Sequence, residues 1–250
     1  MIRITETVKH LLIINTLLFI LSISGLLPIT KLFPLWLPDN PLFKPWQLVT
    51  YMFMHGGWMH LLFNMMALYS FGSTLEYSWG TKKFLFFYLS CGIGAALLHI
   101  GISHWEYQSV VDAMRLIPVF DTDIQLFLTE GRYNSQILES VPLSKLESLY
   151  SVYNSPTVGA SGAIYGLLIA FAMMFPDAEL ALLFIPFPIK ARYFVPGLLG
   201  LDLFLGLKGQ SLFGSGGTGV AHFAHLGGAL VGFIIIWYWK KNQFNNKRWN

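Results

Sequence analysis

The chain has 250 residues, of which 54% are hydrophobic and 12% are charged, and its mean hydropathy is +0.55. A soluble domain carries about a quarter charged residues, so this composition indicates an integral membrane protein. The net charge of +3 is too small and too dispersed to indicate nucleic-acid binding. The single cysteine, Cys91, excludes an internal disulfide or a cysteine-rich metal site, and we expect it to be a packing residue.

Apolar stretches of helical length recur along the chain. Several are shorter than the roughly 20 residues of a full crossing, which indicates helices that end below the membrane surface. Because lipid offers the backbone no hydrogen-bond partners, these stretches should be helices. We expect an all-α membrane protein with one domain over 1–250, a six-helix bundle with a long loop between helices three and four. The stretches cover residues 11–27, 58–76, 84–103, 159–176, 193–207 and 221–239.

Basic residues near the ends of these stretches predict the orientation. Arg3 and Lys9 precede the first stretch as in a signal peptide, but no small-residue cleavage site follows, so we expect a retained helix. If the N-terminus is cytoplasmic, lysines such as Lys82 and Lys240 cluster beside cytoplasmic helix ends. We therefore expect an integral, multi-pass protein with both termini cytoplasmic, in a bacterial cytoplasmic membrane.

The connections between the stretches differ in composition. Residues 28–57 are rich in proline and tryptophan, so they cannot form one helix, and their tryptophans suit the membrane interface. Residues 104–158 form the longest connection and the only acidic one, with scattered apolar residues that indicate some short helix. Residues 178–192 are apolar but are interrupted by Pro186 and Pro188, which predicts a segment in the plane of the membrane surface.

Two polar residues lie inside apolar stretches, where lipid makes them costly unless they serve a function. Ser161 opens the fourth stretch and His225 lies near the head of the sixth. Glycines at i, i+4 spacing beside both residues would let the two helix backbones approach closely and bring hydroxyl and imidazole together. A neutral histidine would then take the serine proton, which predicts a nucleophilic serine. These glycines are Gly162, Gly166, Gly228 and Gly232.

Further polar residues have the spacing that such chemistry needs. Tyr165 lies one helical turn after Ser161, on the same face, where its ring would hold the imidazole in place. The second stretch supplies His60 and Asn64, again one turn apart, and both are suitable donors to a developing oxyanion. The backbone N–H of Ser161, at a helix start, is a further free donor.

In combination these motifs resemble the rhomboid family of intramembrane serine proteases. The resemblance covers roughly residues 40–104 and 157–235. It implies a six-helix fold, a Ser161–His225 dyad without an acid, His60 and Asn64 near the oxyanion, water from the outer side, and no cofactor. The matching residues are Pro45-Trp46-Gln47, Tyr51-Met52-Phe53-Met54-His55-Gly56, His60 with Asn64, Gly72-Ser73-Thr74-Leu75-Glu76 with Gly80, Gly159-Ala160-Ser161-Gly162 with Tyr165, and Ala224-His225-Leu226-Gly227-Gly228.

The chain departs from the family pattern in two places. Gln47 stands where many members carry arginine after the tryptophan, which weakens any expectation of salt bridges in that loop. The connection 104–158 is far longer than in the simplest bacterial members. Access to the site and the choice of substrate therefore stay open.

Plainer interpretations exist for each polar residue. Ser161 alone would be a helix cap or a packing residue. His222, three residues before His225, is an alternative base, although we expect it at the outer water interface. Asp202 invites a proton-relay interpretation, but a hydrogen-bonded structural acid near the outer end fits better. His55 is expected to be a loop or interfacial residue, with a supporting role left open.

We therefore expect an intramembrane serine endopeptidase. Its partners would be the bilayer and membrane proteins with unstable transmembrane helices, because a helix must unwind before its peptide bonds are accessible. One alternative is a catalytically inactive rhomboid-like protein that binds membrane clients, which would usually lack the serine or the histidine. The other is a carrier or channel, which would need inverted repeats or charges lining several spans. The oligomeric state stays open.

Overall fold

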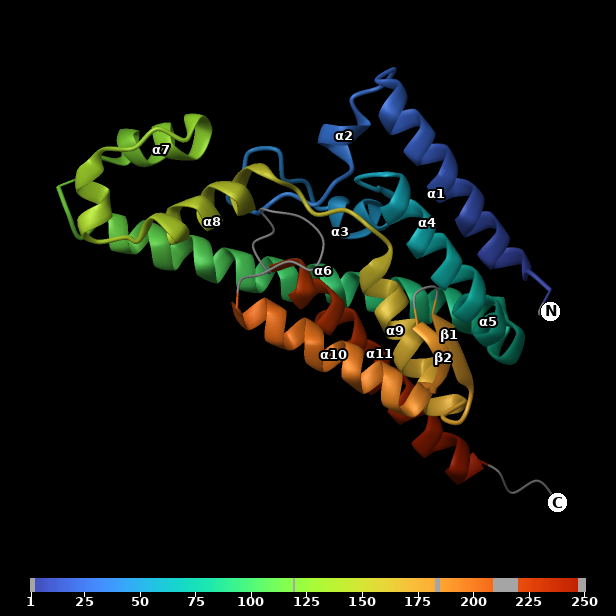
Figure 1. Ribbon diagram of the computed structural model, residues 1–250. Helices are drawn as coiled ribbons and strands as arrows, with labels where there is room; N and C mark the ends of the chain where they lie inside the picture. Colours follow the sequence, from blue (N-terminus) through green and yellow to red (C-terminus); the bar gives the residue numbers. More distant parts are fainter. Residues whose placement is uncertain (1–2, 119, 183–184, 209–219, 247–250) are drawn as a thin grey trace.

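The computed structural model describes residues 3–118, 120–182, 185–208 and 220–246, and these are mostly helical. Helices lie over all the predicted apolar stretches, and α1 begins at the same end of the bundle at which α11 ends (Figure 1). Within the described residues, α1, α6 and α11 are long and apolar enough to cross a membrane, and α9 is a shorter apolar helix. The bundle helices are α1 (Glu6–Ser24), α4 (Trp58–Ala67), α5 (Ser73–Trp79), α6 (Thr81–Met114), α9 (Ser161–Met174), α10 (Ala191–Lys208) and α11 (Val220–Asn246).

The second apolar stretch is not one regular helix. A π-helical turn, η2 (Leu68–Gly72), separates α4 from α5. Gly72 faces α1, because a Cβ there would lie 3.0 Å from the Val8 side chain. The sequence pattern predicts apolar helix here, but a single π turn leaves no mark on hydropathy.

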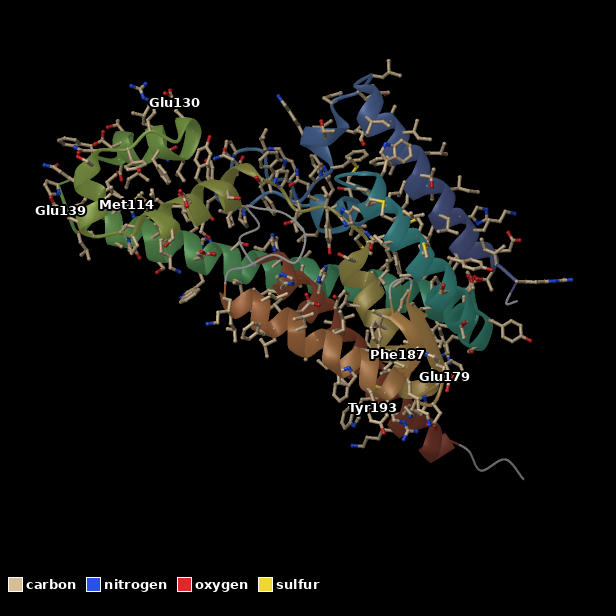
Figure 2. The ribbon with its side chains drawn as sticks, viewed as in Figure 1. Met114, Glu130, Glu139, Glu179, Phe187 and Tyr193 are labelled. Atoms are coloured by element: carbon tan, nitrogen blue, oxygen red, sulfur yellow. The ribbon has the colours of Figure 1, made fainter. Side chains whose placement is uncertain are left out.

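The long connection 104–158 forms a small helical layer with a core of its own. The helix α6 continues well beyond residue 103, and α7 (Asp121–Glu130), a 3₁₀ turn η3 (Ser135–Glu139) and α8 (Leu143–Asn154) cover it. We name α7, η3, α8 and the α6 extension the outer subdomain; Figure 2 labels Met114, Glu130 and Glu139 at its far end. The short helix expected in this connection is thus present. The buried core includes Leu37, Val110, Met114, Ile124, Phe127, Leu128, Ile137, Leu146 and Leu149.

The loop between α1 and α4 is built around one buried amide. Gln47 is fully buried, and its Oε1 accepts from the backbone N–H groups of Trp36 (3.3 Å) and Lys44 (3.1 Å). Its Nε2 donates to the backbone carbonyls of Leu32 (3.2 Å) and Leu42 (2.9 Å). A neutral amide therefore joins the turns of this loop. Its short helices are α2 (Ile29–Leu32), α3 (Gln47–Thr50) and η1 (Tyr51–Phe53).

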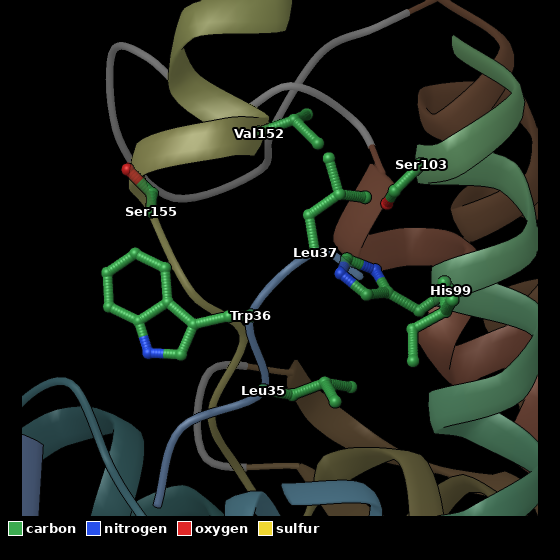
Figure 3. Close-up of a pocket in the computed structure, with 8 residues that line it drawn as sticks. Leu35, Trp36, Leu37, His99, Ser103, Val152 and Ser155 are labelled. Atoms are coloured by element: carbon green, nitrogen blue, oxygen red, sulfur yellow. The ribbon is translucent and has the colours of Figure 1, made fainter. Parts of the chain in front are cut away.

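The same loop is tied to the outer subdomain. The backbones of Leu35 and Thr157 pair as an isolated β-bridge, and the Asn40 Nδ2 donates to the Tyr153 carbonyl at 2.8 Å. Figure 3 shows the small cavity left between the loop, α6 and the end of α8, with Trp36 and Ser155 among its lining residues. The loop is thus anchored to the end of α8 and to the segment just before α9.

Between α9 and α10 the chain forms a β-hairpin. Strands β1 (Glu179–Leu182) and β2 (Ile185–Lys190) are antiparallel, with Glu179 opposite Lys190. The sequence predicts a segment in the plane of the membrane surface here, but it does not predict that two strands pair. Pro186 and Pro188 prevent a helix, but in a two-stranded ribbon their missing N–H groups can face the open edge. The hairpin therefore adds a small β element to the predicted helical fold.

Backbone contact between α9 and α11 forms the centre of the bundle, and α11 also packs along α6. A Cβ on Gly228 would lie 1.8 Å from the Gly162 carbonyl oxygen, and a Cβ on Gly232 would lie 2.7 Å from the Gly166 Cα. Real side chains never approach so closely, so only glycine fits at this crossing. The close approach predicted from the glycine spacing is confirmed.

A buried carboxylate fastens α1 to the bundle. Glu76, on α5, is 4% exposed and accepts from the backbone N–H groups of Thr7 (3.1 Å) and Val8 (3.0 Å). It also accepts from the hydroxyls of Thr5, Thr7 and Thr81. One side chain thereby satisfies two of the free backbone donors at the start of α1.

We expect Glu76→Gln to lower the free energy of unfolding by about 2–4 kcal/mol, because an amide offers one acceptor oxygen and no charge to these donors. Reversible unfolding in mixed micelles would measure the loss. The control is Glu6→Gln, which changes a 78% exposed acid at the start of the same helix and should change stability little. Equal losses in both variants would contradict the role given to Glu76.

We expect Gly228→Ala to destabilise the bundle by about 1–3 kcal/mol, because the added methyl group forces α9 and α11 apart. Its control is Gly200→Ala on α10, where a Cβ would meet nothing within 4 Å. That change should be neutral or stabilising, because alanine favours helix over glycine by about 1 kcal/mol. Thermal unfolding in detergent compares the two, and an unaffected Gly228→Ala would refute the backbone contact.

Candidate active site

The glycine crossing brings Ser161 and His225 together. Ser161 is the first residue of α9, and its Oγ lies 2.9 Å from the Nε2 of His225 on α11. The His225 side chain is 22% exposed, so the pair is partly accessible rather than sealed in the core. This distance suits proton transfer from the hydroxyl to a neutral imidazole. The sequence predicts that the hydroxyl and the imidazole lie within hydrogen-bonding distance, and the observed distance agrees with that prediction.

Tyr165 fixes the plane of the His225 ring. The two rings stack with centroids 4.2 Å apart and an interplanar angle of 10°. Tyr165 lies one turn after Ser161 on α9, so the helix that carries the hydroxyl also carries the surface on which the imidazole rests. A stacked ring has little freedom to rotate, which keeps Nε2 directed at Ser161.

Asp202 on α10 lies behind the imidazole. Its side chain is 2% exposed, and its Oδ1 lies 3.4 Å from the Nδ1 of His225. The same oxygen contacts the Nδ1 of His222, and Oδ2 has no hydrogen-bond partner within the described residues. The hydrogen-bonded acid expected here is present, but it faces the candidate base. Hydropathy marks Asp202 as unusual, whereas only the packing of α10 on α11 shows which residue it faces.

His222 occupies a different place from the one expected. It is 7% exposed and bonds to Asp202, so the expectation of a residue at the outer water interface is wrong. Its ring meets that of His225 edge-on, with centroids 6.1 Å apart. Spacing of three residues on α11 places both rings toward α10, where a buried carboxylate accepts from them.

His60 also lies close to Ser161. The Gly56 N–H points at the Nδ1 of His60 over 3.4 Å, which leaves the proton of the neutral ring on Nε2. A Cβ on Gly159 would lie 2.7 Å from that Nε2 and 3.6 Å from the Ser161 Oγ, so both side chains border the same glycine. Gly159 also has φ +124°, a conformation that other residues avoid. A donor thus lies beside the hydroxyl.

Two further residues, Asn64 and His55, lie near His60 in this part of the candidate site. Asn64 is buried one turn further along α4, and its role as an oxyanion donor stays a prediction. His55, in the preceding loop, meets the His60 ring edge-on with centroids 5.1 Å apart. Burial, and secondarily His60, lowers the pKa of His55 to about 3. The neutral His55 ring therefore supports His60 without adding charge, which agrees with the supporting role left open for it.

Comparison with known proteins identifies the family. The model of the Rhomboid domain matches residues 43–113 and 131–242. The chain is 28% identical over 162 residues to an uncharacterized mitochondrial rhomboid protein of Schizosaccharomyces pombe, covering 60% of this chain and 40% of that protein. It is 27% identical over 203 residues to the rhomboid protease AarA of Providencia stuartii, covering 76% of this chain and 54% of that protein.

A third relative is the mitochondrial presenilin-associated rhomboid-like protein of Homo sapiens, 28% identical over 204 residues, which cover 79% of this chain and 40% of that protein. The chain thus spans about half the length, or less, of these relatives. The family match covers well over half of the chain itself. This integral membrane protein belongs to the rhomboid family.

Proposed function

We propose that the protein is an intramembrane serine endopeptidase that cleaves transmembrane segments of other membrane proteins. The observation that carries the proposal is the 2.9 Å contact between the Ser161 Oγ and the His225 Nε2. The family supports it, and one relative bears the name of a protease. Retention of both side chains argues against the alternative of an inactive client-binding protein.

In the proposed reaction the Ser161 Oγ attacks the carbonyl carbon of the scissile peptide bond as the His225 Nε2 takes its proton. The tetrahedral intermediate then collapses, the C–N bond breaks, and His225 returns the proton to the leaving amine. Water hydrolyses the resulting ester by the same two steps. The oxyanion would accept hydrogen bonds from His60, Asn64 and the Ser161 backbone N–H.

Asp202 would act through His225 as a positioning residue. A carboxylate opposite Nδ1 keeps the ring proton on that nitrogen, so that the lone pair of Nε2 faces Ser161. When the ring becomes imidazolium, the same carboxylate stabilises its charge. The His225–Asp202 distance of 3.4 Å and the competing contact with His222 indicate a weaker coupling than in a soluble Ser-His-Asp triad.

The proposed substrates are helices that unwind easily. A peptide bond in a regular helix is shielded, so residues such as glycine or proline near the cut would favour cleavage. We further propose one domain over residues 1–250 with the stretch 104–158 as an extracytoplasmic insertion. The relatives include a bacterial protein and mitochondrial ones, so they favour neither membrane, and the bacterial cytoplasmic membrane stays a prediction.

We expect Ser161→Ala to abolish covalent labelling of the purified protein by a fluorophosphonate probe and to abolish cleavage of a glycine-containing transmembrane substrate, because both reactions require the Ser161 hydroxyl as the nucleophile. His225→Ala should reduce both to background. The control is Ser155→Ala, which removes an exposed serine at the end of α8. Labelling that persists in Ser161→Ala would remove the serine assignment.

We expect Asp202→Asn to lower kcat roughly tenfold to a hundredfold with KM little changed. This is less than the ~10⁴-fold loss typical of a Ser-His-Asp triad, because Asp202 is shared with His222. The measurement is steady-state cleavage in detergent micelles. The control is Asp121→Asn, which changes an 82% exposed acid on α7, outside the candidate site. An unchanged kcat in Asp202→Asn would show that this acid only supports the fold.

A further inference from the structure

Two histidines and a carboxylate meet beside the candidate nucleophile. Asp202 from α10 and His222 and His225 from α11 each offer a ligand atom, and these atoms lie within 4.8 Å of one another. Imidazole nitrogens with a carboxylate oxygen are a donor set that Zn²⁺ takes in proteins, with water as a fourth ligand. The catalytic proposal uses the His225 Nε2 that points to Ser161 and the contact of Asp202 with His225, but it gives His222 no role.

The carboxylate has unused capacity to bind a cation. Its Oδ1 contacts the Nδ1 atoms of both His222 and His225. Its Oδ2 is buried and has no hydrogen-bond partner within the described residues. A buried oxygen of this kind is costly when unpaired, so a ligand that engages it would be favoured.

To bind a metal ion, the three ligand atoms would have to move only slightly closer together. Ligand atoms of a tetrahedral zinc site lie roughly 3.3 Å apart, since each is about 2.0 Å from the metal. Side-chain rotations within the present 4.8 Å spread would close the difference. Asp202 and His222 are buried, whereas His225 is 22% exposed, so an ion would enter from the side of the candidate active site.

We propose that Asp202, His222 and His225 form an inhibitory binding site for a divalent transition metal ion, for which Zn²⁺ is the test case. Coordination of the His225 Nδ1 places the proton of the neutral ring on Nε2. The ring then donates to the Ser161 hydroxyl instead of accepting its proton, so it can no longer act as the base. Inhibition rests on the proposed protease function, whereas metal binding does not.

The first test measures binding without reference to activity. The protein is purified in detergent without a histidine tag, stripped with EDTA and titrated with Co²⁺, whose visible absorption reports nitrogen and oxygen ligation. We expect one Co²⁺ per chain, displaced by Zn²⁺. In His222→Gln and in Asp202→Asn the affinity should fall at least about tenfold. Two variants, each checked for an unchanged unfolding temperature, keep a folding defect apart from a lost ligand.

The matched control is His104→Gln. His104, on the α6 extension, is 48% exposed and pairs with Asp39 of the loop between α1 and α4, so it offers a histidine–carboxylate pair outside the cluster. Co²⁺ binding that is unchanged in this variant supports the proposal. Absence of stoichiometric Co²⁺ binding in the wild type overturns it, as does equal loss of affinity in His104→Gln and His222→Gln.

The second test measures inhibition. Zn²⁺ should slow fluorophosphonate labelling of Ser161 in the wild type, and EDTA should restore the rate. In His222→Gln, the ratio of the rates with and without Zn²⁺ should be close to one at concentrations that block the wild type. Wild-type labelling that Zn²⁺ leaves unchanged despite bound metal overturns the inhibitory role. Co²⁺ binding in a protein that never labels would instead refute the protease and leave the metal site standing.

Discussion

The backbones of α9 and α11 touch at their glycines, and the candidate site depends on that contact. With Gly228 against the carbonyl of Gly162, the start of α9 lies beside the head of α11. The Ser161 Oγ and the His225 Nε2 then lie 2.9 Å apart. A larger residue at the crossing would separate the helices and with them the hydroxyl and the imidazole. The packing of the bundle and the proposed chemistry therefore both require glycine where α9 and α11 cross.

Features that repeat along the chain could be predicted from the sequence. Apolar stretches and i, i+4 glycines are local patterns, and they located Ser161 and His225 on neighbouring helices. The contact of Asp202 with both histidines could not be predicted, because it depends on how α10 packs on α11. The prediction for His222 is wrong for the same reason. A position near a helix end suggests contact with water, whereas in the structure the buried carboxylate of Asp202 accepts from His222.

The outer subdomain and the loop before α4 hold the approach to Ser161. The pairing of Leu35 with Thr157 and the hydrogen bond from Asn40 to the Tyr153 carbonyl anchor the segment that ends at Gly159. Acidic composition marked the connection 104–158 as unusual but did not show that it has its own core. That core comes from pairing residues distant in sequence, which periodicity within a short helix cannot reveal.

The most direct test of the account is an experimental structure of the protein after reaction with a fluorophosphonate. We predict a phosphorus atom bonded to the Ser161 Oγ, its free oxygen directed at the His60 Nε2, and the His225 ring still stacked on Tyr165. An unmodified Ser161, or an adduct whose oxygen points away from His60 with His225 displaced from the hydroxyl, would contradict the account.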